Sequence, residues 1–205
     1  MKALKVSLES GRFDPVYLFH GTDDYLKEEK VRALIARATE PGTRDFNLEL
    51  LRGTECDAAR LSSALDALPL LAERRVVILR APGSLKKPVR DLRQQYLDRP
   101  AAETTLVVVV PAGTKPDAAQ LKACTGVEFK SLTDDDLAKW IAYQAQTGEG
   151  TTIEPAAATL LAEYGGNDLA LLAGELRKLA AYTNGAPIGP SAVEAVTGVR
   201  PGHTM

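Results

Sequence analysis

Short runs of β-branched and other apolar residues alternate, along the first two thirds of the chain, with segments in which apolar positions have a helical spacing. The apolar runs are VYLF at 16–19, FNLELL at 46–51, RVVIL at 75–79, TLVVVVP at 105–111 and VEFK at 127–130. The helical patterns lie near 23–38, 57–68, 87–98 and 116–123. This alternation predicts an α/β domain with five strands in a mostly parallel sheet and helices flanking it.

The pattern becomes purely helical from Thr133 onward. Three helices are expected: TDDDLAKWIAYQAQ with Thr133 as its N-cap, IEPAAATLLAEYGG with Pro155 in its first turn, and NDLALLAGELRKLAAYTNG starting on Asn167. The composition changes near residues 130–147. We therefore expect an α/β domain at 1–147, followed by a small helical domain at 148–205.

Composition and charge describe an ordinary globular chain. Of 205 residues, 45% are hydrophobic and 25% charged, and the net charge of -2 argues against strong nonspecific binding to nucleic acid or anionic membranes. The two cysteines, Cys56 and Cys124, form neither a disulfide framework nor a zinc motif. No run is long and apolar enough for a signal peptide or a membrane span, so we expect a cytoplasmic protein. The tail TGVRPGHTM suggests a truncated chain, with a short native tail as the alternative.

The turn after the first expected strand, HGTDDYLKEEK, is where an α/β domain of this layout binds nucleotide phosphates. A phosphate loop reads G-x-x-x-x-G-K-[ST]. Counted from Gly21, Lys27 falls at the lysine position, but Leu26 replaces the second glycine and Glu28 replaces the hydroxyl. Acidic residues in this turn suit the positive end of a helix that holds no anion. We predict that the loop binds no nucleotide.

Other catalytic arrangements are also missing from the sequence. A metal-binding carboxylate is expected at the end of a central strand, and neither RVVILRAPG nor LVVVVPAG supplies one. The only histidines are His20 and His203, and no Ser/His/Asp or Cys/His arrangement is evident. We predict no catalysis, no cofactor and no metal site.

The corner SALDALPLLAERRVVIL places Leu68, Leu70 and Leu71 around Pro69, between a helical pattern and a strand pattern. Corners normally run over the surface and are polar, so these leucines form either a buried turn or an exposed patch for a partner. Leu68 continues the apolar stripe of the preceding helix and is therefore a candidate for partial burial. Leu70 and Leu71 cannot both follow that stripe, and the residues alone leave both interpretations open.

Four segments together resemble the delta subunit of the bacterial DNA polymerase III clamp loader. They are PVYLFHGTDDYLKEEKVRALI, FNLELLRGTECDAARLSSALDALPLLAERRVVILRAPG, SLTDDDLAKWI and LAEYGGNDLALLAGELRKLAAY. The resemblance covers essentially the whole chain and depends on the order and spacing of these motifs. It implies an AAA+-like α/β domain and a helical lid that lack ATP-binding residues. The family's third, collar domain is not included here, so we do not expect this chain to assemble the five-subunit loader.

The resemblance also implies a role and partners. Family members bind the ring-shaped sliding clamp, the beta subunit, and help to open it for loading onto primed DNA. For the full-length protein the implied loader partners are the gamma/tau and delta prime subunits; DNA is contacted indirectly through the complex, and no membrane is involved. A hydrophobic wedge in that family matches Leu68, Pro69, Leu70 and Leu71, which favours the exposed patch.

Two alternatives belong to other functional classes. One is a divergent nucleotide-binding or nucleotide-hydrolysing module. The other is a DNA-binding module, suggested by a series of basic residues: Arg74, Arg75, Arg80, Lys86, Lys87, Arg90 and Arg93. Val89, Leu92 and Tyr96 form the apolar stripe of the helix at 87–98, so its arginines are expected on the solvated face and direct DNA binding is expected to be weak.

Overall fold

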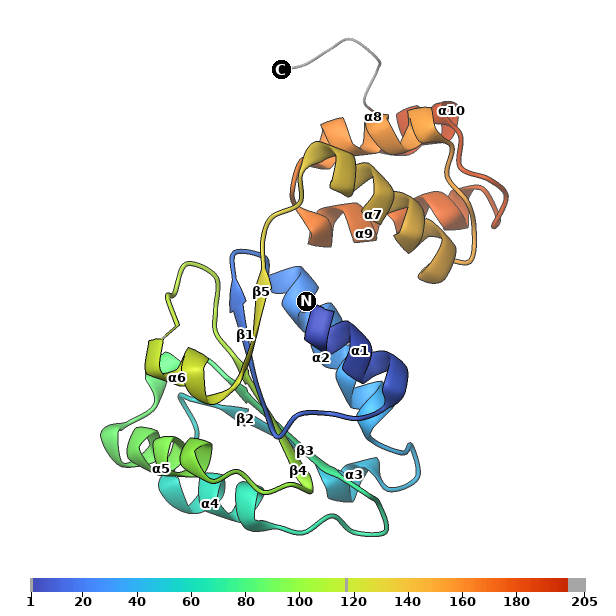
Figure 1. The fold of residues 1–205 in the computed structure, drawn as a ribbon. Coiled ribbons are helices and arrows are strands. Elements are labelled where there is room, and N and C mark those ends of the chain that lie inside the picture. The colour runs from blue at the N-terminus through green and yellow to red at the C-terminus, as the bar shows by residue number, and fades with distance from the viewer. Residues whose placement is uncertain (1, 117, 199–205) are drawn as a thin grey trace. The chain divides into compact units, whose positions relative to one another are not determined.

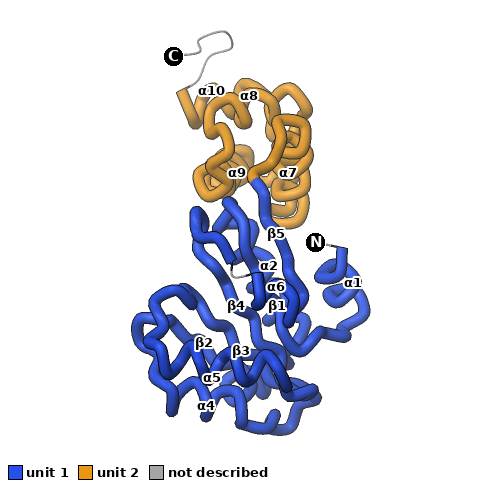
Figure 2. The backbone as a smooth tube through the Cα atoms, turned by 60° about the vertical axis from the view of Figure 1, so that its left-hand side comes forward, with its two compact units in different colours: residues 1–130 blue, residues 131–205 orange. Residues whose placement is uncertain are grey.

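The structure is a computed structural model that describes residues 2–116 and 118–198. Its strands are β1 (Val16–Gly21), β2 (Leu48–Arg52), β3 (Arg75–Arg80), β4 (Thr104–Val109) and β5 (Thr125–Phe129). The helices of the first unit are α1 (Lys2–Ser10), α2 (Asp24–Ala38), α3 (Arg44–Asn47), α4 (Ala58–Asp66), α5 (Lys87–Asp98) and α6 (Ala118–Ala123). A short 3₁₀ helix, η1 (Pro82–Ser84), follows β3. The chain divides into two units after Lys130 (Figure 2).

All five strands are parallel, in the order β2-β3-β4-β1-β5 (Figure 1). The predicted five-stranded α/β sheet is therefore confirmed. Residues 46 and 47 belong to α3 rather than to the second strand, which begins at Leu48. Helix α1 was not predicted from the sequence; it places Leu4 and Ser7 in buried positions beside the sheet.

Each face of the sheet is covered by its own set of helices, because successive residues of a strand point to opposite faces. Toward α1 and α2 point the side chains of Tyr17, Phe19, Val76, Ile78, Val107 and Val109. Toward α4 and α5 point those of Val16, Leu18, Val77, Leu79, Leu106 and Val108. Strands buried on both faces need the continuous apolar runs that the sequence shows.

The second unit consists of α7 (Asp134–Thr147), α8 (Pro155–Gly165), α9 (Leu169–Tyr182) and α10 (Pro190–Thr197). Thr133 caps α7 as predicted, whereas α9 is capped by Asp168 rather than by Asn167. The division after Lys130 differs from the expected boundary after residue 147, because α7 packs on α8 and α9 and contributes the buried Trp140 to their core. Helix α10 was not predicted.

Candidate functional site

The carboxyl ends of β1 and β4 lie next to each other at a switch point of the sheet. β1 leads into α2 on one face, whereas β4 leads toward α6, whose Leu121 packs on the other face. Crevices at such switch points are where open α/β sheets bind ligands. The turn singled out as a degenerate phosphate loop lies here.

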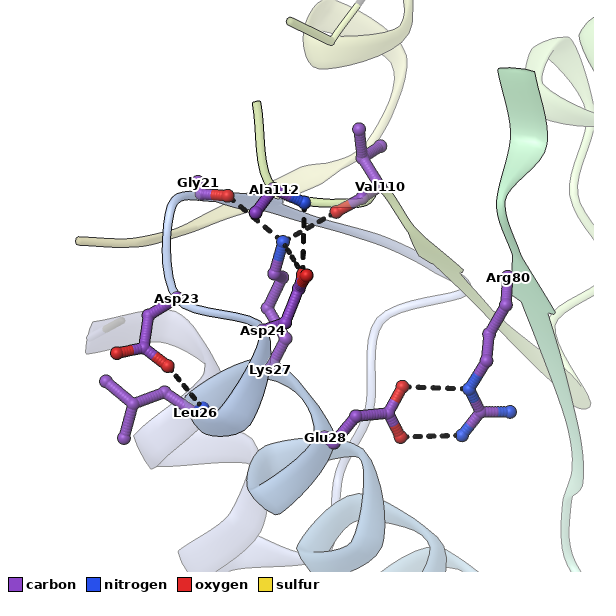
Figure 3. A network of polar contacts seen from close by, with 9 residues as sticks. All are labelled: Gly21, Asp23, Asp24, Leu26, Lys27, Glu28, Arg80, Val110 and Ala112. Carbon is purple, nitrogen blue, oxygen red and sulfur yellow. Dashed lines mark hydrogen bonds and ion pairs between the residues drawn. The ribbon is translucent and has the colours of Figure 1, made fainter. Parts of the chain in front are cut away.

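Lys27 reaches between these strand ends and is fully buried there, with 0% of its surface exposed (Figure 3). Its Nζ lies 3.0 Å from the Gly21 carbonyl oxygen, 2.7 Å from the Val110 carbonyl oxygen and 2.6 Å from Asp24 Oδ1. The same Asp24 oxygen accepts a hydrogen bond from the Ala112 amide at 3.1 Å. An ammonium group has three N–H donors, and these three acceptors use all of them. The lysine therefore has no donor left for a phosphate.

The other loop residues also serve the fold rather than an anion. Asp23 caps α2, accepting a hydrogen bond from the Leu26 amide at 2.9 Å, so a carboxylate lies at the helix end where a phosphate would bind. Gly21 has φ 115°, and an added Cβ would lie 2.1 Å from the Phe129 carbonyl oxygen. The glycine is therefore explained by its close approach to β5.

Glu28 replaces the hydroxyl that would hold magnesium, and it forms a two-point ion pair with Arg80 at the end of β3 (Figure 3). Both N–H···O distances are 2.8 Å. The Arg80 guanidinium holds the pKa of the Glu28 carboxyl below its usual value. The end of β3 thus carries a cation, Arg80, in place of a metal-binding carboxylate, and Arg80 already occupies the carboxylate of Glu28.

We expect the chain to bind neither ATP nor ADP, with or without magnesium. The reason is that Lys27, Asp23 and Glu28 already have internal partners and that the carboxylates of Asp23 and Glu28 repel phosphate. Adding glycine at position 26 and threonine at position 28 is not expected to create an ATPase, since Lys27 would stay bonded to Gly21 and Val110. Calorimetric titration measures this; micromolar binding of magnesium-ATP would contradict it.

The lowered pKa of Glu28 predicts a pH dependence of stability. A carboxyl with a depressed folded-state pKa stabilises fully above its ordinary pKa, and this contribution is lost as the pH falls through the lowered value. We expect Glu28→Gln to reduce the free energy of unfolding by about 1 kcal/mol or less at neutral pH, because the pair is partly solvated. Urea unfolding should show this difference shrinking toward zero in acid; a difference independent of pH would exclude the ion pair as its cause.

The leucine corner, defined as residues 67–74 between α4 and β3, lies at the surface. Leu68, Leu70 and Leu71 are 79%, 51% and 84% exposed. Helix α4 ends at Asp66, two residues before Leu68, so Leu68 leaves the buried stripe of that helix and is not part of the core. Leu71 adopts φ 52°, in the left-handed region that leucine rarely occupies. Of the two interpretations of the corner, the structure supports the exposed patch.

The basic series does not form one surface. Arg74 donates to the Ala102 carbonyl and the Thr105 hydroxyl, Arg75 donates to backbone carbonyls, and Arg80 pairs with Glu28. Arg93 is buried, so the expectation that all arginines of the helix at 87–98 lie on its solvated face was wrong. Exposed positions within the series are Lys86, Lys87 and Arg90. Most of its arginines are thus tied into the domain, which disfavours a DNA-binding role.

The remaining candidate side chains are two cysteines and two histidines. Burial raises the pKa of the Cys56 thiol and raises that of Cys124 to about 11, so neither forms a thiolate at neutral pH. Burial lowers the pKa of His20, and His203 lies outside the described residues. Within residues 2–116 and 118–198, no three His, Cys, Asp or Glu side chains are grouped as metal ligands. In the same residues no helix is both long and apolar enough to span a membrane.

Comparison with known sequences assigns the family. A family model described as DNA polymerase III, delta subunit, matches residues 17–135. The chain belongs to this family. The curated DNA polymerase III subunit delta of Bacillus subtilis (strain 168) is 26% identical over 189 residues, which are 86% of this chain and 54% of that relative. This delta-family chain therefore spans about half the length of that curated relative.

Solved structures support the fold. The Bacillus subtilis DNA clamp loader delta protein matches with a TM-score of 0.69 and 24% identity, over 95% of this chain and 61% of that chain. The Thermotoga maritima RuvB Holliday junction branch migration motor matches with a TM-score of 0.64 and 19% identity, over 95% of this chain and 66% of that chain. The AAA+-like fold predicted for this delta-family chain is confirmed.

Proposed function

We propose that this delta-family chain binds a ring-shaped sliding clamp through Leu68, Pro69, Leu70 and Leu71. As part of a clamp loader, it would help to open the ring for loading onto primed DNA without hydrolysing ATP itself. The observation that carries the proposal is the exposure of three leucines within four residues, on a domain whose other leucines are mostly buried. Clustered exposed apolar side chains mark interaction sites.

The corner has the chemistry of an anchor for an apolar pocket. A few central apolar residues usually supply most of the free energy of such a contact. Pro69 fixes one backbone dihedral beside the leucines, which reduces the conformational entropy lost when the corner becomes ordered in a complex. A group of exposed leucines favours a hydrophobic pocket on another protein over a charged partner.

The closed phosphate loop supports the non-hydrolysing part of the proposal. Lys27 and Glu28 are both satisfied internally, so ATP chemistry in an assembled loader would belong to other subunits. In the full-length protein, gamma/tau and delta prime are the proposed loader partners. The chain is then a non-catalytic member of the polymerase holoenzyme. Any DNA contact is proposed to be indirect, through the assembly.

The test is a calorimetric titration of this chain into the sliding clamp of the same organism, without nucleotide. Saturable binding is expected, and its dissociation constant should not change when magnesium-ATP is added. No binding at any accessible concentration, or binding that requires ATP, would contradict the proposed function. Binding to a primed DNA duplex alone, with a steep salt dependence, would favour the DNA-binding alternative instead.

A further inference from the structure

One buried side chain from another segment holds the backbone of the leucine corner. Asn47 ends α3 and is 0% exposed. Its Nδ2 donates to the Leu70 carbonyl oxygen at 2.8 Å, and its Oδ1 accepts from the Leu70 amide at 2.7 Å. Both backbone polar groups of Leu70 are therefore satisfied by one amide. Leu70 is held as a neighbouring β-strand would hold it, although 23 residues separate the two positions.

Asn47 is itself fixed in place. Its Nδ2 also donates to the Thr43 carbonyl oxygen at 3.0 Å, so both amide protons have acceptors. Arg75, the first residue of β3, donates to the carbonyl of Phe46 and, at 3.1 Å, to the carbonyl of Ala64 in α4. The end of α3 and the last turn of α4 are thus attached to the same strand, and Asn47 extends from this rigid base to the corner.

Arg74 anchors the far end of the corner through its bonds to Ala102 and Thr105, but burial does little to hold the leucines. Leu68 and Leu71 are largely solvent-exposed, so burial does not fix their orientation. Leu71 nevertheless adopts φ 52°, a conformation that a free leucine rarely populates. Fixing both polar groups of the preceding residue restricts where the chain can go next, so the Asn47 contact helps to maintain this unusual arrangement.

We propose that Asn47 is a positioning residue that presets the leucine corner for the clamp. The inference rests on the proposed function, since it names the residue that prepares the same surface. An amide suits the task because Leu70 needs both an acceptor and a donor from one rigid group, and a carboxylate would face the Leu70 carbonyl oxygen with no proton to donate. Binding then requires less ordering of the corner, which raises affinity without adding a contact.

The first test is Asn47→Ala in this 205-residue chain. We expect its affinity for the clamp to fall about tenfold, because the free energy needed to order a few side chains on binding has about that effect. The Leu70 amide should exchange with solvent at least about tenfold faster in the free variant, while amides of β1, β3 and β4 keep their relative protection. Calorimetry and hydrogen exchange followed by NMR measure these two effects.

Tyr17→Phe is the matched control. Tyr17 is also fully buried, and its hydroxyl bonds Ser7 Oγ at 2.8 Å, away from the corner. This variant removes a buried hydrogen-bonding group as well, but it should leave clamp affinity and Leu70 exchange unchanged. If Tyr17→Phe weakens clamp binding as much as Asn47→Ala does, the effect is one of general stability and the positioning role is wrong.

A double-mutant cycle separates the two hypotheses. In a chain that already carries Leu70→Ala and Leu71→Ala, adding Asn47→Ala should change affinity less than twofold, because the leucine side chains that Asn47 positions have been removed. Equal losses in both backgrounds would overturn the positioning role. If the leucine changes leave clamp affinity intact, the proposed function fails; if they abolish binding while Asn47→Ala has no effect, only the positioning role fails.

Discussion

Replacing Leu70 and Leu71 together by alanine is expected to weaken clamp binding about a hundredfold or more, because truncating a central interface residue typically loses 1 to 4 kcal/mol and a tenfold change is about 1.4 kcal/mol. The free energy of unfolding should change by about 1 kcal/mol or less, since Leu71 is largely exposed and Leu70 about half exposed. Calorimetry against the sliding clamp and urea unfolding measure the two quantities on the same preparations.

A leucine from the preceding helix provides the control. Leu61 on α4 is completely buried, so Leu61→Ala should lower the free energy of unfolding by about 2 to 5 kcal/mol through the cavity that it leaves. Its clamp affinity per folded molecule should stay unchanged. The opposite pattern for the Leu70 and Leu71 pair, lost stability with unchanged affinity, would place the corner in the core and remove the physical support for clamp binding.

Replacing Lys27 by methionine is expected to lower the free energy of unfolding by about 2 to 4 kcal/mol. In the wild type the buried carbonyls accept hydrogen bonds from the ammonium, and in the variant they would have no donor. Methionine matches the apolar stem of lysine as far as Cε and lacks only the ammonium, so the change removes mainly the charge and its hydrogen bonds. Gly21, Asp24 and Val110 supply those bonds from three segments that meet at the carboxyl edge of the sheet. Urea unfolding checks the expected loss.

Lys139 on α7 is the comparison for Lys27. It pairs with Asp136 on the surface, where its side chain is 76% exposed, so Lys139→Met should change stability by less than about 0.5 kcal/mol. A Lys27→Met chain as stable as the wild type would show that the buried ammonium does not hold the loop closed. Nucleotide binding by that variant is not expected either, since Asp23 and Glu28 keep their charges.

The layers of the first unit were predictable from sequence because burial on both faces requires apolar runs that are easy to recognise. The positions of β1, β3 and β4 follow directly from those runs. Helix α1 was missed because it is short and only Leu4 and Ser7 of its nine residues are buried. The observed boundary after Lys130 differs from the expected one because the sequence of an amphipathic helix such as α7 shows which of its faces is buried, but not which unit covers that face.

Only those features of the site that lie within one short sequence motif could be predicted from the sequence. Failure of the phosphate-loop pattern at Leu26 and Glu28 is visible in the sequence, but the partner of Glu28 is Arg80, 52 residues away. The partner of Leu70 is likewise remote, and Asn47 looked like part of a strand in FNLELL. An asparagine between Phe46 and Leu48 was the available signal, since a polar residue within an apolar run is often buried with a specific hydrogen-bonding task.

The most direct measurement of the central claim is amide hydrogen exchange of this chain in the presence and absence of saturating sliding clamp. The account predicts that exchange slows in residues 67–74, the leucine corner, and stays unchanged in the closed phosphate loop at 21–24. Unchanged exchange in the corner when the clamp is bound, or protection centred on residues 21–24, would contradict it.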